Sequence, residues 1–98
     1  MNTDKPNVFN KSRVGSYDIQ AFSGGGRRYD RVLEYRVWTV NSQGKTGLYV
    51  FNNYKDAEHH NVKNGGNLVA LVEQDYYFDK YNNRINKKRI TEWRIEWL

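Results

Sequence analysis

The chain has 98 residues, the size of one domain with a single hydrophobic core, and it contains no cysteine, which excludes disulfides, thiolate metal sites and a cysteine nucleophile. Its net charge of +5 and pI near 9.5 favour acidic or phosphate-rich partners, provided that the basic residues cluster. The polar N-terminus lacks the apolar segment of a signal peptide, and the longest apolar run, 68–72, is too short to span a membrane. We therefore expect a cytoplasmic protein that does not enter a membrane.

The first strand signal follows a polar N-terminal segment. Residues 1–14 are aperiodic, so we expect a mobile lead-in, from which Val8 could still dock on the core. Residues 16–22 alternate between apolar and polar positions, as a half-buried strand does. A glycine-rich break at 23–26 and a second alternating run over 30–40 then predict an antiparallel hairpin.

A short strand over 47–51 and the one convincing helix come next. One of the asparagines at 52–53 can cap the start of this helix, and Asn64-Gly65-Gly66 ends it, since glycine readily adopts the left-handed conformation there. The helical positions available to pack on a sheet are Tyr54, Ala57 and Val62.

Two further strands complete the chain. Residues 67–78 open with a run that is apolar on both faces, which predicts a central strand. Residues 91–98 alternate, with Trp93 and Trp97 on the expected buried face. The order β-β-β-α-β-β predicts an α+β fold, a mainly antiparallel sheet of about five strands with one short helix packed on it. We expect one domain over 15–98, with the strand order open.

Two basic segments are candidates for binding. Arg27 and Arg28 follow the glycine-rich break, where backbone amides and guanidinium groups suit phosphate. The densest run of cations lies within 80–89. The cations proposed as contacts there are Arg84, Lys87, Lys88 and Arg89. Cations interleaved with tyrosines suit single-stranded nucleic acid or an acidic protein surface, and the alternative is a solvated hairpin loop.

Aromatic residues give a second hint of a contact surface. Trp38 shares a face of its predicted strand with Glu34 and Arg36, so its ring is either half-covered by the helix or exposed for binding. Residues 76–78 are three consecutive aromatics, which cannot all face one core. Tyrosine, tryptophan and arginine are enriched at interfaces. The residues expected to anchor a partner are therefore Arg36, Trp38, Tyr76 and Tyr77.

No spacing in the chain assembles a catalytic or metal site. Asp56 and His60 share a helix face, but a zinc site needs at least three protein ligands, and we expect no metal and no cofactor. Glu73 and Asp75 share a strand face, and paired carboxylates can divide acid and base roles. Glu73 with a histidine and an arginine would also make the general-base set of a small ribonuclease. The chain has these ingredients, without a spacing that ties them together: Glu73, His59, His60, Arg84 and several tyrosines.

These residues favour a small non-catalytic binding module that engages a protein or ribonucleoprotein partner, of the adaptor or inhibitor type that a phage or mobile element would carry. The first alternative is a direct binder of RNA or single-stranded DNA that uses the loops at 27–31 and 80–89. The second is a ribonuclease-like enzyme. A homodimer formed through the C-terminal strand is a further alternative, because soluble proteins avoid an exposed strand edge unless it is covered or paired.

Overall fold

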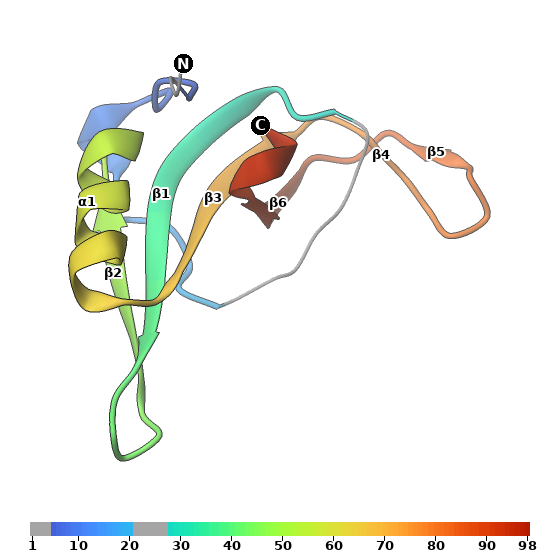
Figure 1. Ribbon diagram of the computed structural model, residues 1–98. Coiled ribbons are helices and arrows are strands. Elements are labelled where there is room, and N and C mark those ends of the chain that lie inside the picture. The colour runs from blue at the N-terminus through green and yellow to red at the C-terminus, as the bar shows by residue number, and fades with distance from the viewer. Residues whose placement is uncertain (1–4, 21–27) are drawn as a thin grey trace.

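The computed structural model describes residues 5–20 and 28–98, and its main feature is an antiparallel sheet with one α-helix packed on it (Figure 1). Four strands form the sheet in the order β2-β1-β3-β6. These strands are β1 (Arg31–Val40), β2 (Thr46–Phe51), β3 (Asn67–Gln74) and β6 (Arg89–Arg94). A second, smaller sheet consists of β4 (Tyr77–Phe78) and β5 (Arg84–Ile85). The predicted α+β class and the central position of β3 are confirmed.

The helix α1 (Tyr54–Asn64) lies over β1 and its neighbours on one face of the sheet (Figure 1). It begins after Asn53, whose side-chain oxygen accepts a hydrogen bond from the Asp56 N–H at 2.8 Å. It ends at Gly65, which adopts a φ of 73° that favours glycine. Both ends match the sequence prediction. Within the described part of the chain, no helix has the length and apolar character needed to cross a membrane.

Only one side of α1 contributes to the core. Ala57 is fully buried, and the Tyr54 ring packs edge-on against the ring of Tyr35, with the centroids 5.7 Å apart. Val62 is 79% exposed, so the prediction that it packs on the sheet is wrong. Val62 follows Ala57 by five positions, which places it about 140° around the helix at about 100° per residue.

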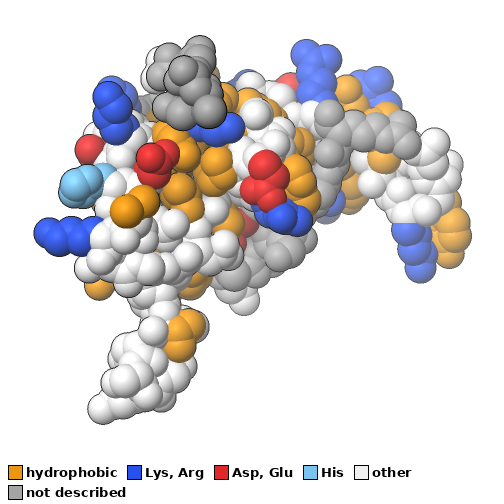
Figure 2. Space-filling model, viewed as in Figure 1, with side chains coloured by type: hydrophobic (Ala, Val, Ile, Leu, Met, Phe, Trp, Pro, Cys, Tyr) orange, Lys and Arg blue, Asp and Glu red, His pale blue; other side chains and the backbone are white. Residues whose placement is uncertain are grey.

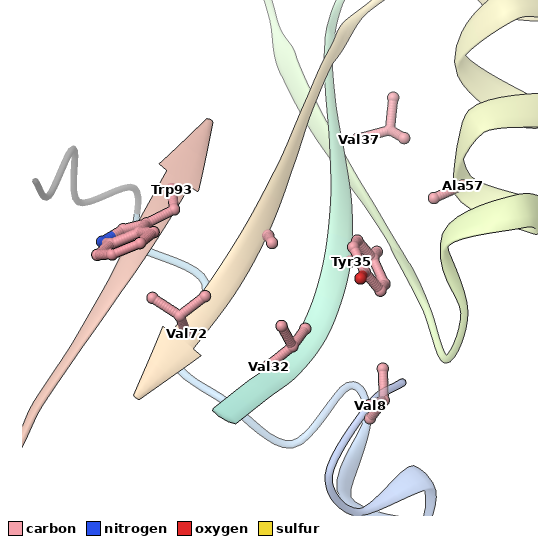
Figure 3. Packing of buried hydrophobic residues seen from close by; sticks show 8 residues of the cluster. Val8, Val32, Tyr35, Val37, Ala57, Val72 and Trp93 are labelled. Atoms are coloured by element: carbon pink, nitrogen blue, oxygen red, sulfur yellow. The ribbon is translucent and has the colours of Figure 1, made fainter. Parts of the chain in front are cut away.

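A β-bulge in β1 decides which of its side chains reach the core. The pairing of β1 with β3 shifts between Val32 and Glu34, which leaves Leu33 as an extra residue. Val32 therefore joins Tyr35 and Val37 on the helix side, whereas strict alternation predicted the opposite face. Figure 3 shows these side chains between the sheet and α1. The core cluster consists of Val8, Val32, Tyr35, Val37, Ala57, Ala70, Val72 and Trp93.

The N-terminal segment continues the edge of β1 beyond the end of β2. Val8 forms an isolated parallel bridge with Val32, and the Phe9 N–H donates to the Val32 carbonyl at 2.8 Å. Val8 is buried in the core cluster, so it docks on the core as the sequence allowed. The mobility expected for residues 1–14 stays a prediction.

The strand predicted over 16–22, with its hairpin to 30–40, is wrong for the residues that the structure describes. Residues 16–20 form no strand, and the rest of that run lies outside the described residues, as does the break at 23–26. β1 is paired with β3 on one edge, and its other edge is taken by β2 over Tyr35–Val40 and by the bridge from Val8 to Val32. Ile19 is exposed, so the alternation here does not mark a buried face.

The C-terminal strand is shorter than predicted. β6 ends at Arg94, where the chain turns into a 3-10 helix, η2 (Ile95–Trp97). Trp93 is buried as expected, whereas Trp97 is exposed, with its ring edge-on to that of Trp93. The alternation that would bury Trp97 stops before this residue. β6 is an edge strand of the main sheet, and a homodimer formed through it stays a prediction.

Candidate functional site

The chain leaves the main sheet after Gln74 and forms a projecting hairpin (Figure 1). We call residues 76–89 the basic arm; it comprises β4, a turn, β5 and the link to β6. The arm contains five cations and one carboxylate, Asp79. The backbone N–H groups of Tyr81 and Asn83 each donate to Oδ1 of Asp79 at 2.9 Å, and donation from Asn83 lowers the pKa of this carboxyl. The Asp79 carboxylate therefore stabilises the turn of the arm.

Two arginines of the basic arm lie over tyrosine rings. The guanidinium carbon of Arg84 is 3.9 Å from the ring centroid of Tyr76, and that of Arg89 is 4.3 Å from the centroid of Tyr77. A cation–π contact of this kind contributes about 0.5–1 kcal/mol at an exposed site. A planar guanidinium held in this way is pre-organised for stacking. Tyr76 and Tyr77 therefore support the arginines beside them.

Three lysines and a tyrosine of the arm are exposed. Lys87 and Lys88 lie in the link between β5 and β6, and Tyr81 lies at the tip of the hairpin. The Lys80 Nζ lies 5.2 Å from the centroid of the Tyr81 ring. Figure 2 shows Lys and Arg side chains along the projecting hairpin, with hydrophobic side chains among them. The arm thus presents cations and an aromatic ring on one narrow element.

A buried glutamine joins the basic arm to the second basic segment. Oε1 of Gln74 accepts hydrogen bonds from Nε and Nη2 of Arg89 at 3.1 and 2.9 Å. Nε2 of Gln74 donates to the carbonyl oxygen of Arg28 at 2.5 Å, and Arg28 itself is exposed at the base of the arm. Arg27 lies outside the described residues. Two segments that were predicted separately are therefore brought together by a residue that the sequence did not single out.

The structure places Arg36 in the interior, so its predicted role as a surface anchor is wrong. The side chain is fully buried on the sheet face opposite α1. Its guanidinium pairs with Glu34 at 2.6 Å and with Glu92 at 2.8 Å, and it donates to the carbonyl oxygen of Asp18. Both carboxylates flank Leu71 of β3, which pairs with each of them across the sheet. These partners compensate the guanidinium for its loss of water.

Trp38 lies at the opposite end of the sheet from the basic arm. It pairs with Asn67 at the start of β3, whereas the arm follows the end of β3 at Gln74. These two positions on β3 are about 23 Å apart, at about 3.3 Å per residue. The Trp38 indole N–H donates to Glu92 at 2.7 Å, and its ring is half-buried. Trp38 and the tyrosines of the arm therefore do not form one contact surface.

The side chains considered for acid–base chemistry lie on opposite faces of the sheet. Val72 belongs to the core under α1, so Glu73, the next residue of β3, points to the other face, where it pairs with Arg31 at 2.5 Å. His60 lies on α1, with its ring centroid 4.5 Å from that of Tyr49. Glu73 and His60 therefore do not form one acid–base pair. Among the described residues, no group of three or more His, Asp and Glu side chains is placed to hold a metal ion.

Comparison with known proteins assigns the chain to no family. No family model, no curated protein and no solved structure matches it. The geometry described above, in which Gln74 contacts both the Arg89 guanidinium and the Arg28 backbone at one end of the sheet, is the basis for the function proposed below.

Proposed function

We propose that the protein is a small non-catalytic module that binds single-stranded nucleic acid, RNA or DNA, through the basic arm and Arg28. The observation that carries this proposal is the convergence of the two basic segments on Gln74. Single-strand binders combine a basic track for phosphates with rings or guanidinium planes on which bases stack. The arm offers both, in the form of the stacked Arg84 and Arg89 and the exposed Tyr81.

An acidic protein surface is the other partner that these residues suit. The sequence favoured a protein or ribonucleoprotein partner anchored by Arg36, Trp38, Tyr76 and Tyr77, since binding energy at protein interfaces concentrates in a few packed aromatic and arginine residues. Arg36 is buried, and Trp38 lies at the far end of β3. The geometry therefore favours the nucleic-acid partner, whether the strand is free or part of a ribonucleoprotein.

The absence of catalysis is part of the proposal. General acid–base cleavage of RNA needs a base within hydrogen-bond reach of the attacking 2′-hydroxyl and an acid within reach of the leaving 5′-oxygen of the same phosphodiester. Glu73 and His60 lie on opposite sides of the sheet. We therefore expect a bound RNA strand to remain intact, which gel electrophoresis of the recovered strand checks.

The salt dependence of binding tests the proposal. We would measure the fluorescence anisotropy of a labelled uridine strand of about 12 nucleotides, within the range of known single-strand sites. The logarithm of the affinity should fall linearly with the logarithm of the salt concentration, by about 0.7 for each phosphate neutralised. The double variant Lys87→Glu, Lys88→Glu should bind more weakly and reduce this slope by about 1.4, which corresponds to two phosphate contacts.

A second double variant controls for net charge. Lys45→Glu with Lys55→Glu has the same net charge as the arm variant, but its changes lie in the turn after β1 and on α1, and both lysines are exposed. We expect this control to keep most of the affinity of the original protein. Equal losses in the two variants would overturn the assignment to the arm, and failure of the original protein to bind at low salt would overturn the proposed function.

A further inference from the structure

We propose that a pocket beside the basic arm holds one guanine base of the bound strand, an inference that rests on the proposed function. The pocket has a volume of about 240 Å³. Sites for drug-sized ligands occupy roughly 300–1,000 Å³, so this smaller pocket suits a single base. It lies between the N-terminal segment and the adjoining ends of β1, β3 and β6. The lining residues that matter here are Phe9, Arg13, Arg31, Glu73, Lys88 and Ile90.

The N-terminal segment and the β-bulge of β1 both contribute to the wall of this pocket. The hydrogen bond from the Phe9 N–H to Val32 holds the N-terminal segment at the edge of β1. The bulge sends the extra residue Leu33 to the pocket. The Glu73 side chain points to this side of the sheet because it follows the core residue Val72, and successive side chains of a strand point to opposite faces. Lys88 lines the pocket from the basic arm. A strand bound along the arm therefore reaches the pocket through Lys88, which belongs to both.

The polar groups of the pocket match one base edge. Glu73 is only 9% exposed, and its Oε1 accepts a hydrogen bond from Nη1 of Arg31 at 2.5 Å and lies 3.6 Å from Nζ of Lys88. A carboxylate acceptor and two cationic donors therefore stand side by side. Guanine carries the complementary pattern, with the O6 acceptor beside the N1–H and N2–H donors. Adenine, cytosine and uracil do not place two adjacent donors next to such an acceptor.

Phe9 and Arg13, which also line the pocket, are suited to contact the face of the base and the phosphate of the nucleotide. Phe9 is 64% exposed, which is unusual for so large an apolar ring, and the guanidinium carbon of Arg31 lies 4.6 Å from its centroid. The ring is therefore accessible for stacking with a base. Arg13 is exposed and lies over the Tyr17 ring at 5.1 Å, where its charge is available to the phosphate that accompanies the base. The pocket thus combines stacking, edge recognition and charge.

Strands that differ by one base test the inference. We would compare uridine strands of about ten nucleotides that carry G, A, C or U at one central position. The G strand should bind at least about fivefold more tightly than the U strand, as expected for one good bidentate base contact. Glu73→Gln should remove this preference while leaving U-strand binding and its salt slope in place. Asp75→Asn, which removes an exposed carboxylate from the same strand end, is the matched control and should retain the preference.

A second variant guards against loss of folding in Glu73→Gln. The Phe9 side chain is exposed, so Phe9→Ala should melt at nearly the original temperature and still lower the G preference at least threefold, because the base loses its stacking partner. Binding of all four strands with equal affinity would overturn this inference and leave the proposed function intact. Absence of binding to every strand would overturn both. A preference that survives in both variants would place guanine recognition elsewhere and overturn the pocket.

Discussion

Replacement of Arg36 by methionine tests whether the buried ion network holds the second face of the sheet together. Methionine fills much of the same space but leaves Glu34 and Glu92 without their shared cation. Each carboxylate keeps one hydrogen bond, from the Gly15 N–H at 2.9 Å and from the Trp38 indole at 2.7 Å. Loss of one partner from a buried ion pair costs about 3–5 kcal/mol, a large part of the roughly 5–15 kcal/mol that stabilises a domain.

Thermal unfolding followed by circular dichroism measures this loss. For a domain of this size each kcal/mol corresponds to about 4–8 °C, so Arg36→Met should lower the melting temperature by at least about 12 °C. Arg94→Met is the matched control on the same sheet. Arg94 also pairs with a carboxylate, that of Glu96, but these side chains are 67% and 59% exposed. Such an exposed pair contributes less than about 1 kcal/mol.

A triple variant separates lost charge pairing from lost packing. Arg36→Met combined with Glu34→Gln and Glu92→Gln removes the unpaired charges and keeps acceptors for the two remaining donors. We expect it to recover at least half of the free energy of unfolding that Arg36→Met loses. Equal melting temperatures for Arg36→Met and Arg94→Met would refute the reasoning, since the buried network would then contribute no more than a surface pair.

Three further predictions concern the helix ends and the tyrosines. Asn53→Ala should lower the free energy of unfolding by about 1 kcal/mol through loss of the N-cap, whereas Asn53→Asp should retain most of it, as thermal melts would show. Gly66→Ala should destabilise more than Gly65→Ala in the same assay, because a Cβ at Gly66 would lie 2.8 Å from a backbone oxygen of β1, while that at Gly65 meets open space. Burial raises the pKa of Tyr35, and a hydrogen bond with the neighbouring glutamate raises the pKa of Tyr54 to about 12. Tyrosines of the unfolded chain ionise at about pH 10, so the raised pKa values of Tyr35 and Tyr54 should leave the free energy of unfolding unchanged below that pH and lower it above. Tyr35→Phe should therefore reduce the loss of this free energy that urea unfolding measures between about pH 9 and pH 11.

The helix and most strands are predictable from the sequence because their signals are local. Asn53 caps the start of α1 with its own side chain, and Gly65 can end the helix because it has no side chain. Alternation marks β1, but it misplaces Val32, because the bulge at Leu33 depends on pairing with β3 and has no counterpart in the sequence of β1 itself. Alternation also misleads at 16–20, where the edges of β1 are already occupied.

The candidate site is predictable only in part. The cations of the basic arm follow one another in the chain, so composition is enough to find them. Their approach to Arg28 depends on Gln74, which joins segments that are distant in sequence. Arg36 looks like a surface arginine until the carboxylates of other strands are placed around it. Phe9, an aromatic within a polar segment, was the available sign of the pocket, but its contacts with β1 are long-range.

Photo-crosslinking tests the central claim most directly, because it reports where a bound strand lies. A strand containing 4-thiouridine would be bound at low salt, irradiated and digested, and the crosslinked peptides identified by mass spectrometry. The account predicts crosslinks within residues 76–89, at Tyr76, Tyr77 or Tyr81, which disappear in Lys87→Glu, Lys88→Glu and persist in Lys45→Glu, Lys55→Glu. Crosslinks confined to the peptide that contains Trp38, or no crosslink to any peptide, would contradict it.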